Sequence, residues 1–400
     1  MIKTVCFIVN DNLYNSKRYF VNRLVEALKR EGVQSFIFDT KGGALETEEI
    51  MELQRRSPDF TCSFNNIFPL KSGKYLWDQM EIPHHTYLVD PPVFWIHLTR
   101  SPYSILSCVD IDDLHTLESI HFDRRFFLPH AVERERVAAP LEFRDRPYDV
   151  VMIGSCYDHV TMKESWRKIF SKEVCKVIDE AIELCFSSPE TTFSHAVHQA
   201  WARSKLDPRG VDFEKLCECV DMYTRGKDRV ELIRSIKDVE VHVFGRRYWE
   251  ESNKMRLWKD YVGDCPNVVI HDLVEYDQIF DVLGQSKICL HSNPAIRNGT
   301  HERYFNGLAM GCTVIGNINS YMNKEFGEKR GVYEYQFNAR DKVNDLVKDI
   351  LADESQRLER VEEGRKKIAE AHTWDHRAQA MLEIIPQMIE RIHALVNYKS

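Results

Sequence analysis

Short apolar runs alternate with segments of helical periodicity along the first third of the chain. The runs have the length of strands and cover residues 4–9, 35–39, 60–64, 85–89, 105–109 and 126–128. Between them lie segments such as residues 17–30, in which apolar side chains recur every three or four positions. Alternation of strands with crossover helices predicts a parallel, doubly wound sheet.

A second series of the same kind follows a linker that holds Pro140 and ends at Pro147. Its expected strands cover residues 149–153, 239–244, 267–270, 288–290, 313–315 and 332–337. Residues 157–237 contain no strand pattern and are too long for one crossover, which predicts a helical insertion.

The predicted fold is therefore α/β, with two Rossmann-like doubly wound domains that face each other across a cleft. The first domain would cover residues 1–138 and the second residues 147–374. A final helix, residues 375–400, is expected to pack back across both domains. A cleft between two domains is the usual place for a ligand.

One stretch of the second domain, residues 288–317, has the pattern of strand, loop, helix and strand. Thr300 is expected to cap the helix and Gly311 to end it. The apolar positions of the helix are three and four residues apart, at Tyr304, Phe305, Leu308 and Ala309. A loop and a helix N-terminus at the carboxyl end of a parallel strand form an anion-binding place.

The polar side chains of this stretch suit a nucleoside diphosphate. Arg297 and Arg303 can bind phosphate oxygens as forks, and a neutral His301 can donate one hydrogen bond. Glu302 can accept hydrogen bonds from two ribose hydroxyls at once. The alternative is an ordinary exposed helix turn, which would account for Glu302 and Arg303 without a ligand.

Other strand ends of the second domain reach the same edge of its predicted sheet. Gly154 and Ser155 follow one strand, and Gly245 and Arg246 follow the next. Glycine at such a place lets a ligand approach the backbone closely, although neither pair is a full dinucleotide-binding motif. His271 ends a third strand, where it would contact a base or a sugar; a simple turn explains it equally well.

A transferase needs a general base to take a proton from an acceptor hydroxyl, and the first domain supplies the candidates. Asp11, Asp90 and His130 lie at expected strand ends and are the candidate bases. Asp90 precedes two prolines, so its alternative role is to start a turn. His84 and His85 lie at the start of a strand, on the opposite edge, and are expected on the surface.

Composition narrows the class of protein. The net charge of -8 argues against general nucleic-acid binding. No apolar run approaches the roughly 20 residues that span a bilayer, and no signal peptide is evident. The eleven cysteines lack the spacing of a metal site, and reduced thiols of this kind favour a cytoplasmic protein. Asp110 and Asp112 are expected to cap a helix rather than hold a metal, so no metal site is predicted.

Three runs carry a resemblance to a known family: residues 150–155 (VVMIGS), residues 241–245 (VHVFG) and residues 303–312 (RYFNGLAMGC). With them the chain resembles GT-B glycosyltransferases, and within these the CgeB-like (spore maturation protein) group related to glycosyltransferase family 1. The first domain is similar to the domain that often precedes this lobe, with Asp90 and the two prolines at a matching place.

The resemblance implies that the second domain binds the nucleotide sugar and that the first domain binds the acceptor. Retaining members of the wider family commonly carry a Glu-x7-Glu motif. Here Asn298 and Asn306 stand at the two acidic positions. An amide such as Asn306 still bonds to a ribose, and Glu302 lies one turn away, so a retaining or an inverting outcome is left open.

The preferred hypothesis is a metal-independent, cytoplasmic glycosyltransferase that uses a nucleoside-diphosphate sugar as donor substrate and needs no other cofactor. Its acceptor would be a protein or a glycan, and residues 157–237 are the expected place for specificity or oligomerisation. One alternative is a non-catalytic module that docks a surface or coat protein. Another is a nucleotide-sugar isomerase or phosphorylase on the same scaffold. The sequence identifies neither the sugar nor the nucleotide base.

Overall fold

The computed structural model describes residues 1–10, 15–40, 47–65, 73–141, 145–245 and 255–399. The chain forms two compact units: Met1–Ala138 together with Ala369–Ser400, and Ala139–Ile368. The last helix therefore belongs to the first unit, whereas the sequence pattern predicts a separate segment from residue 375.

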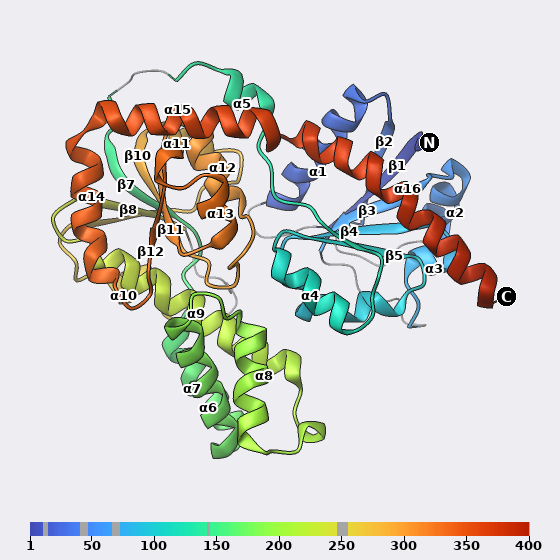
Figure 1. Ribbon diagram of the computed structural model, residues 1–400, viewed down its shortest axis with the longest axis horizontal. Coiled ribbons are helices and arrows are strands. Elements are labelled where there is room, and N and C mark those ends of the chain that lie inside the picture. The colour runs from blue at the N-terminus through green and yellow to red at the C-terminus, as the bar shows by residue number, and fades with distance from the viewer. Residues whose placement is uncertain (11–14, 41–46, 66–72, 142–144, 246–254, 400) are drawn as a thin grey trace. The chain divides into compact units, whose positions relative to one another are not determined.

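The first unit is built on a sheet of six parallel strands in the order β2-β1-β3-β4-β5-β6 (Figure 1). The strands are β1 Thr4–Val9, β2 Gln34–Asp39, β3 Phe60–Phe64, β4 His84–Leu88, β5 Ser104–Cys108 and β6 Arg125–Phe127. Its helices are α1 Ser16–Arg30, α2 Thr47–Arg56, α3 Leu76–Met80, η2 Pro92–Arg100, α4 Ile111–Ser119, α5 Arg134–Ala138 and α16 Trp374–Lys399. The strand order reverses between β1 and β3, which is where doubly wound sheets bind ligands.

The second unit repeats this plan with the order β12-β11-β10-β7-β8-β9. The strands are β7 Tyr148–Ile153, β8 Val241–Phe244, β9 Val268–His271, β10 Ser286–His291, β11 Thr313–Asn317 and β12 Val332–Tyr335. The helices that follow β8 are α10 Trp258–Val262, α11 Ile279–Gly284, α12 Glu302–Ala309, α13 Ser320–Glu325, α14 Val343–Ala352 and α15 Glu354–Ala371. Here the order reverses between β7 and β10. Two parallel sheets with helices confirm the predicted fold class.

Four α-helices occupy the expected insertion: α6 His159–Ile169, α7 Lys172–Ser187, α8 Phe193–Ser204 and α9 Phe213–Ser235. They are drawn in green to yellow-green in Figure 1, where α6, α7 and α8 extend away from the sheet of the second unit. The longest, α9, leads into β8 and therefore also serves as the crossover helix. It buries four charged side chains, namely Asp221, Arg225, Asp228 and Arg229. Buried charges must be paired or hydrogen-bonded, so α9 forms specific polar contacts with the rest of its unit.

The last helix, α16, packs on α1 within the first unit. Phe20, Phe64 and Trp374 form an aromatic cluster there, with ring centroids 5.6–6.3 Å apart. Arg377, one turn into α16, is 4% exposed. Its guanidinium donates to the carbonyl oxygens of Pro129 (2.6 Å), His130 (2.8 Å) and Ala371 (2.9 Å). One side chain thus ties the exit of β6 to the start of the last helix.

The expectation that His84 and His85 lie on the surface is wrong, because both are fully buried in β4. His84 bonds to the Thr61 and Ser63 hydroxyls, at 2.7 and 3.0 Å, and its ring lies 3.7 Å from that of Trp77. Burial lowers the pKa of His85 to about 3. A central strand of a parallel sheet is covered on both faces, which is why polar residues there must find partners inside.

Replacing Arg377 with alanine should destabilise the protein strongly. The substitution removes the donors of several buried carbonyl oxygens, and a charge-assisted hydrogen bond of this kind contributes about 1.5–3 kcal/mol. We expect the free energy of unfolding to fall by roughly 3 kcal/mol or more in a urea titration. Arg391→Ala is the matched control, since Arg391 lies on the same helix, is exposed and bonds one carbonyl. Equal stability of the two variants would contradict this role for Arg377.

Candidate functional site

The site begins at α12, the helix that follows β10. Its N-cap is His301 rather than the predicted Thr300, which is fully buried one residue earlier. His301 Nδ1 accepts a hydrogen bond from the Arg303 amide (3.3 Å) and lies 2.8 Å from the Glu302 carboxylate. The helix start therefore carries a histidine cap next to the expected ribose-binding carboxylate.

Two arginine side chains converge on Gly154, at the end of β7. A Cβ atom placed on Gly154 would lie 3.3 Å from Arg229 Nη1 and 3.7 Å from Arg303 Nη2, so the two nitrogens are at most about 7 Å apart. Arg229 Nη1 also donates to the Ser155 carbonyl oxygen (2.8 Å), and Arg303 Nη1 bonds His291 Nδ1 (3.1 Å). Two guanidinium groups this close create a positive field that favours an anion with several oxygens.

Gly245 completes this edge by letting two strand ends approach each other. Its φ is +151°, and a Cβ atom there would overlap the carbonyl oxygen of Gly154. The Gly154 amide donates to the Phe244 carbonyl oxygen at 2.9 Å. Only glycine satisfies both conditions, because other residues avoid this φ and carry a Cβ. The structure thus brings together Gly154, Ser155, Gly245 and Arg303, while Arg246 lies outside the described residues.

The helical insertion contributes residues to the site that the sequence did not predict. Asp228, next to Arg229 on α9, is fully buried and accepts hydrogen bonds from Ser292 Oγ (2.6 Å) and Tyr335 Oη (2.5 Å). It also pairs with Arg340 at 2.7 Å. Asp228 thereby fixes the first residue of the loop after β10. No motif marks these residues, because α9 carries charged residues along its whole length.

Arg297 takes a different place from Arg303. It is 1% exposed, its guanidinium lies 4.6 Å from the centre of the Phe337 ring, and it donates to the Cys185 carbonyl oxygen on α7 (2.7 Å). These contacts join the loop after β10 to the insertion. The structure therefore places Arg297 behind the loop, as a support.

Asn306 is buried and His271 is half-buried, and both contact other side chains of the protein. Asn306 is 1% exposed and donates from Nδ2 to Tyr276 Oη at 2.8 Å. His271 stacks on Phe244, with ring centroids 4.1 Å apart, and its Nε2 lies 2.8 Å from His242 Nδ1. Burial, and then His242, lowers the pKa of His271. Asn306 anchors the segment after β9, and His271 packs on a face of the sheet.

The C-terminal end of α12 is held by three buried arginines. Arg146 donates to the Met310 carbonyl oxygen (2.9 Å), Arg357 to that of Gly311 (3.2 Å) and Arg365 to that of Ala309. Cations stabilise the negative end of a helix dipole, and donors satisfy its last carbonyl groups. The helix is thus fixed at one end, while its other end carries His301, Glu302 and Arg303.

A second support lies beside the loops of this edge. Glu334 at the end of β12 accepts a hydrogen bond from the Asn319 amide at 2.7 Å. Asn319 Nδ2 in turn reaches the Ile296 carbonyl oxygen in the loop after β10 (3.5 Å). Burial raises the pKa of Glu334 to about 7, against the opposing effect of that amide.

In the first unit, the structure places the candidate bases differently. Asp90 is partly exposed after β4, and its Oδ2 accepts a hydrogen bond from Asn65 Nδ2 at 2.7 Å. His130 is 2% exposed, and its ring packs against Phe20 with centroids 6.4 Å apart. Asp11 lies outside the described residues. Asp110 caps α4, as expected, by accepting from the Asp112 amide.

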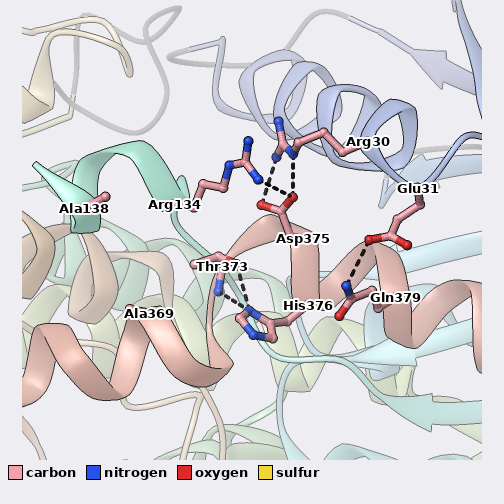
Figure 2. A pocket seen from close by; sticks show the side chains of 9 residues that line it. All are labelled: Arg30, Glu31, Arg134, Ala138, Ala369, Thr373, Asp375, His376 and Gln379. Carbon is pink, nitrogen blue, oxygen red and sulfur yellow. Dashed lines mark hydrogen bonds and ion pairs between the residues drawn. The ribbon is translucent and has the colours of Figure 1, made fainter.

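A pocket of about 470 Å³ lies elsewhere in the first unit, near the C-terminal end of α1 and the first turns of α16. Figure 2 shows that its charged side chains point toward one another. Arg30 binds Asp375 at 2.5 and 2.9 Å, Arg134 lies 3.7 Å from the same carboxylate, and Gln379 donates to Glu31. These groups satisfy each other, so we assign the site to Gly154 and Arg303 rather than to this pocket.

Two other features are absent among the residues that the structure describes. No group of three or more histidine, cysteine, aspartate or glutamate side chains is placed to hold a metal ion. No described helix combines the length and apolar character needed to cross a membrane.

Comparisons with known proteins agree with the predicted glycosyltransferase class. Residues 227–383 match a family model described as glycosyl transferase-like. Among solved structures, a glycosyltransferase from Rickettsia africae is 11% identical with a TM-score of 0.58, over 97% of this chain and 99% of that one. The sucrose-phosphate synthase of Thermosynechococcus elongatus is 10% identical with a TM-score of 0.57, over 97% and 100%. No curated protein matches by sequence.

A third similar structure contains bound ligands. HepE of Anabaena, solved in complex with UDP and glucose, is 7% identical with a TM-score of 0.55, over 96% of this chain and 100% of that one. At such identities the likeness is one of fold, and that fold is GT-B. The match of residues 227–383 to a glycosyl transferase-like model and the GT-B fold of the chain both agree with the predicted enzyme class.

Glu334 should make stability depend on pH. Its pKa is raised from 4.5 to about 7 in the folded protein. The folded state thus binds more protons than the unfolded state between these values, and stability falls as pH rises from 4.5 through 7. Glu334→Gln keeps the acceptor for the Asn319 amide. In urea titrations, its free energy of unfolding should fall between pH 5 and pH 8 by roughly 1–2 kcal/mol less than that of the wild-type protein. Parallel pH profiles of the two proteins would show that Glu334 is ionised when folded.

Proposed function

We propose that the protein is a glycosyltransferase that takes its sugar from a nucleoside-diphosphate donor. The observation that carries this proposal is the convergence of Arg229 and Arg303 on the backbone of Gly154. This place lies at the carboxyl edge of β7 and β10, where the strand order reverses, and beside the N-terminus of α12. A diphosphate there would meet two forked cations, a helix N-terminus and a backbone without a side chain.

The same two arginines can also stabilise the diphosphate as it leaves. When the bond between the sugar and the diphosphate breaks, negative charge grows on the diphosphate oxygens. Arg229 and Arg303 are held by backbone and histidine contacts, so they can stabilise this charge without rearranging. Two guanidinium groups support a reaction that is independent of a metal ion, with the sugar nucleotide as substrate and no other cofactor. Glu302 is suited to the ribose hydroxyls.

For the acceptor, we propose Asp90 as the general base. Its carboxylate is partly exposed and is oriented by Asn65, as a base must be to take a proton from a bound hydroxyl. His130 is less suitable because its ring is enclosed beside Phe20. We also propose that the protein belongs to the CgeB-like group, that its acceptor is a protein or a glycan and that it is located in the cytoplasm. Residues 157–237 are the proposed oligomerisation surface.

A non-catalytic binding module is the second candidate. Asparagine stands at both positions of the Glu-x7-Glu motif, and Asn306 is buried against Tyr276. Incubation with nucleotide sugars separates the candidates. Release of the nucleoside diphosphate supports transfer, a changed sugar supports isomerisation, and binding without turnover supports the module.

The nucleotide site can be tested by thermal shift with UDP, GDP, CDP and dTDP. A ligand at about 100 times its Kd adds roughly 2.7 kcal/mol of stability, which is a shift of several degrees. Arg303→Ala and Arg229→Ala should each weaken binding about tenfold or more, because each removes charge-assisted hydrogen bonds to phosphate.

Arg234→Ala is the matched control, since Arg234 lies on α9 near Arg229 but pairs with Asp264 at the protein surface. It should retain the full shift. The proposal is wrong if no nucleotide stabilises the wild-type protein, or if both site variants bind as tightly as the control.

A further inference from the structure

The pocket of the first unit borders both places where the chain crosses between the units. The chain leaves the first unit after Ala138 and returns to it at Ala369, and both residues line the pocket. An isolated parallel bridge joins the backbone near the two crossings. In it the Val132 amide donates to the His372 carbonyl oxygen (3.2 Å), and the Trp374 amide donates to that of Val132 (3.1 Å). A molecule bound in the pocket would therefore contact both crossings.

The charges that line the pocket are already engaged with one another. Arg30 binds Asp375 with two of its guanidinium nitrogens, at 2.5 and 2.9 Å. Arg134 Nε donates to Glu135 at 2.9 Å, and Arg134 Nη1 lies 3.7 Å from Asp375. An anionic ligand would compete with Asp375 for the guanidinium groups, and a cationic ligand would compete with these groups for Asp375. The pocket therefore favours a neutral ligand.

His376 supplies a hydrogen-bond donor to the pocket. Its Nδ1 accepts from the Thr373 amide at 3.3 Å and lies 2.7 Å from the Thr373 hydroxyl. Burial, and then Arg377, lowers the pKa of His376, so the ring is neutral at pH 7. The proton of the neutral ring is on Nε2, since Nδ1 is an acceptor. No partner for Nε2 is found among the residues that the structure describes.

Gln379 and Glu31 supply acceptors beside this donor. Gln379 Nε2 donates to Glu31 Oε1 at 2.9 Å, which leaves Gln379 Oε1 and Glu31 Oε2 for a ligand. Figure 2 shows both side chains close to His376, with Arg134 on the other side of Asp375. A set of donors and acceptors suits hydroxyl groups, because each hydroxyl both donates and accepts.

We propose that this pocket is a second sugar site, which binds a neutral mono- or disaccharide and fastens the two chain crossings. Its volume of about 470 Å³ lies in the range of small-molecule sites. His376 Nε2 and the Nη atoms of Arg134 donate to sugar oxygens, while Gln379 Oε1 and Glu31 Oε2 accept from sugar hydroxyls. The bound sugar joins α1, α5 and the start of α16, so it stabilises the backbone bridge against local opening. The site is independent of the proposed nucleotide site.

The ring signal of His376 in NMR spectra tests the site directly. It is assigned in histidine-labelled, full-length protein by its loss in His376→Ala, and is followed while methyl glucoside or maltose is added. We expect the signal to shift and to saturate. Glucose 6-phosphate and glucosamine, which are charged, should bind at least about tenfold more weakly.

Arg134→Met should weaken binding of the neutral sugars about fivefold, because it removes hydrogen bonds to the ligand without touching the contact between His376 and Thr373. His393→Ala is the control, since His393 is exposed on the same helix, and it should bind as wild type does. At a sugar concentration about ten times Kd, hydrogen exchange of the Val132 and Trp374 amides should slow about tenfold.

Three results would overturn the inference: a His376 signal that no neutral sugar shifts, tighter binding of the charged sugars, or equal binding by Arg134→Met and His393→Ala. Exchange rates of the two amides that do not change with saturating sugar would show that the ligand does not fasten the crossings. Absence of a nucleotide shift in the wild-type protein would instead contradict the proposed function, and the NMR titration would still report on this pocket.

Discussion

The second unit depends on how one short helix is held. The last carbonyl groups of α12 accept hydrogen bonds from Arg146, Arg357 and Arg365, which come from the start of the unit and from α15. Removing one of them would leave carbonyl oxygens buried without a donor, at a cost of about 1–3 kcal/mol each. With this end fixed, the opposite end presents Arg303 at a constant place relative to Gly154. A cationic site of this kind needs such support because two neighbouring guanidinium groups repel each other.

The insertion is a structural part of the same site. Its last helix, α9, brings Arg229 to Gly154 and uses Asp228 to hold Ser292, the first residue of the loop after β10. Arg297 ties that loop to α7 from behind. The loop is therefore fixed on both sides by residues that lie more than sixty positions away in the sequence. Such an arrangement positions the candidate site before any ligand arrives, which lowers the cost of ordering on binding.

Local pattern was enough to predict the two parallel sheets, since alternating strands and helices allow few other folds. It also located the helix of residues 302–309 and the glycines at 154 and 245, because turn and cap residues are local signals. It could not show that Arg297 turns inward or that Arg229 turns toward the site, because tertiary contacts decide both. The same holds for His84 and His85, which look like surface residues at a strand start but find hydroxyl partners in the core.

Arg229, Arg303 and Gly154 together form the proposed diphosphate site. Its most direct test is a crystal structure of the protein with UDP, or with whichever nucleoside diphosphate stabilises it most. We expect diphosphate oxygens about 3 Å from both guanidinium groups, beside the Gly154 backbone. A diphosphate bound away from both arginines, for example in the pocket next to Arg30 and Arg134, would contradict it.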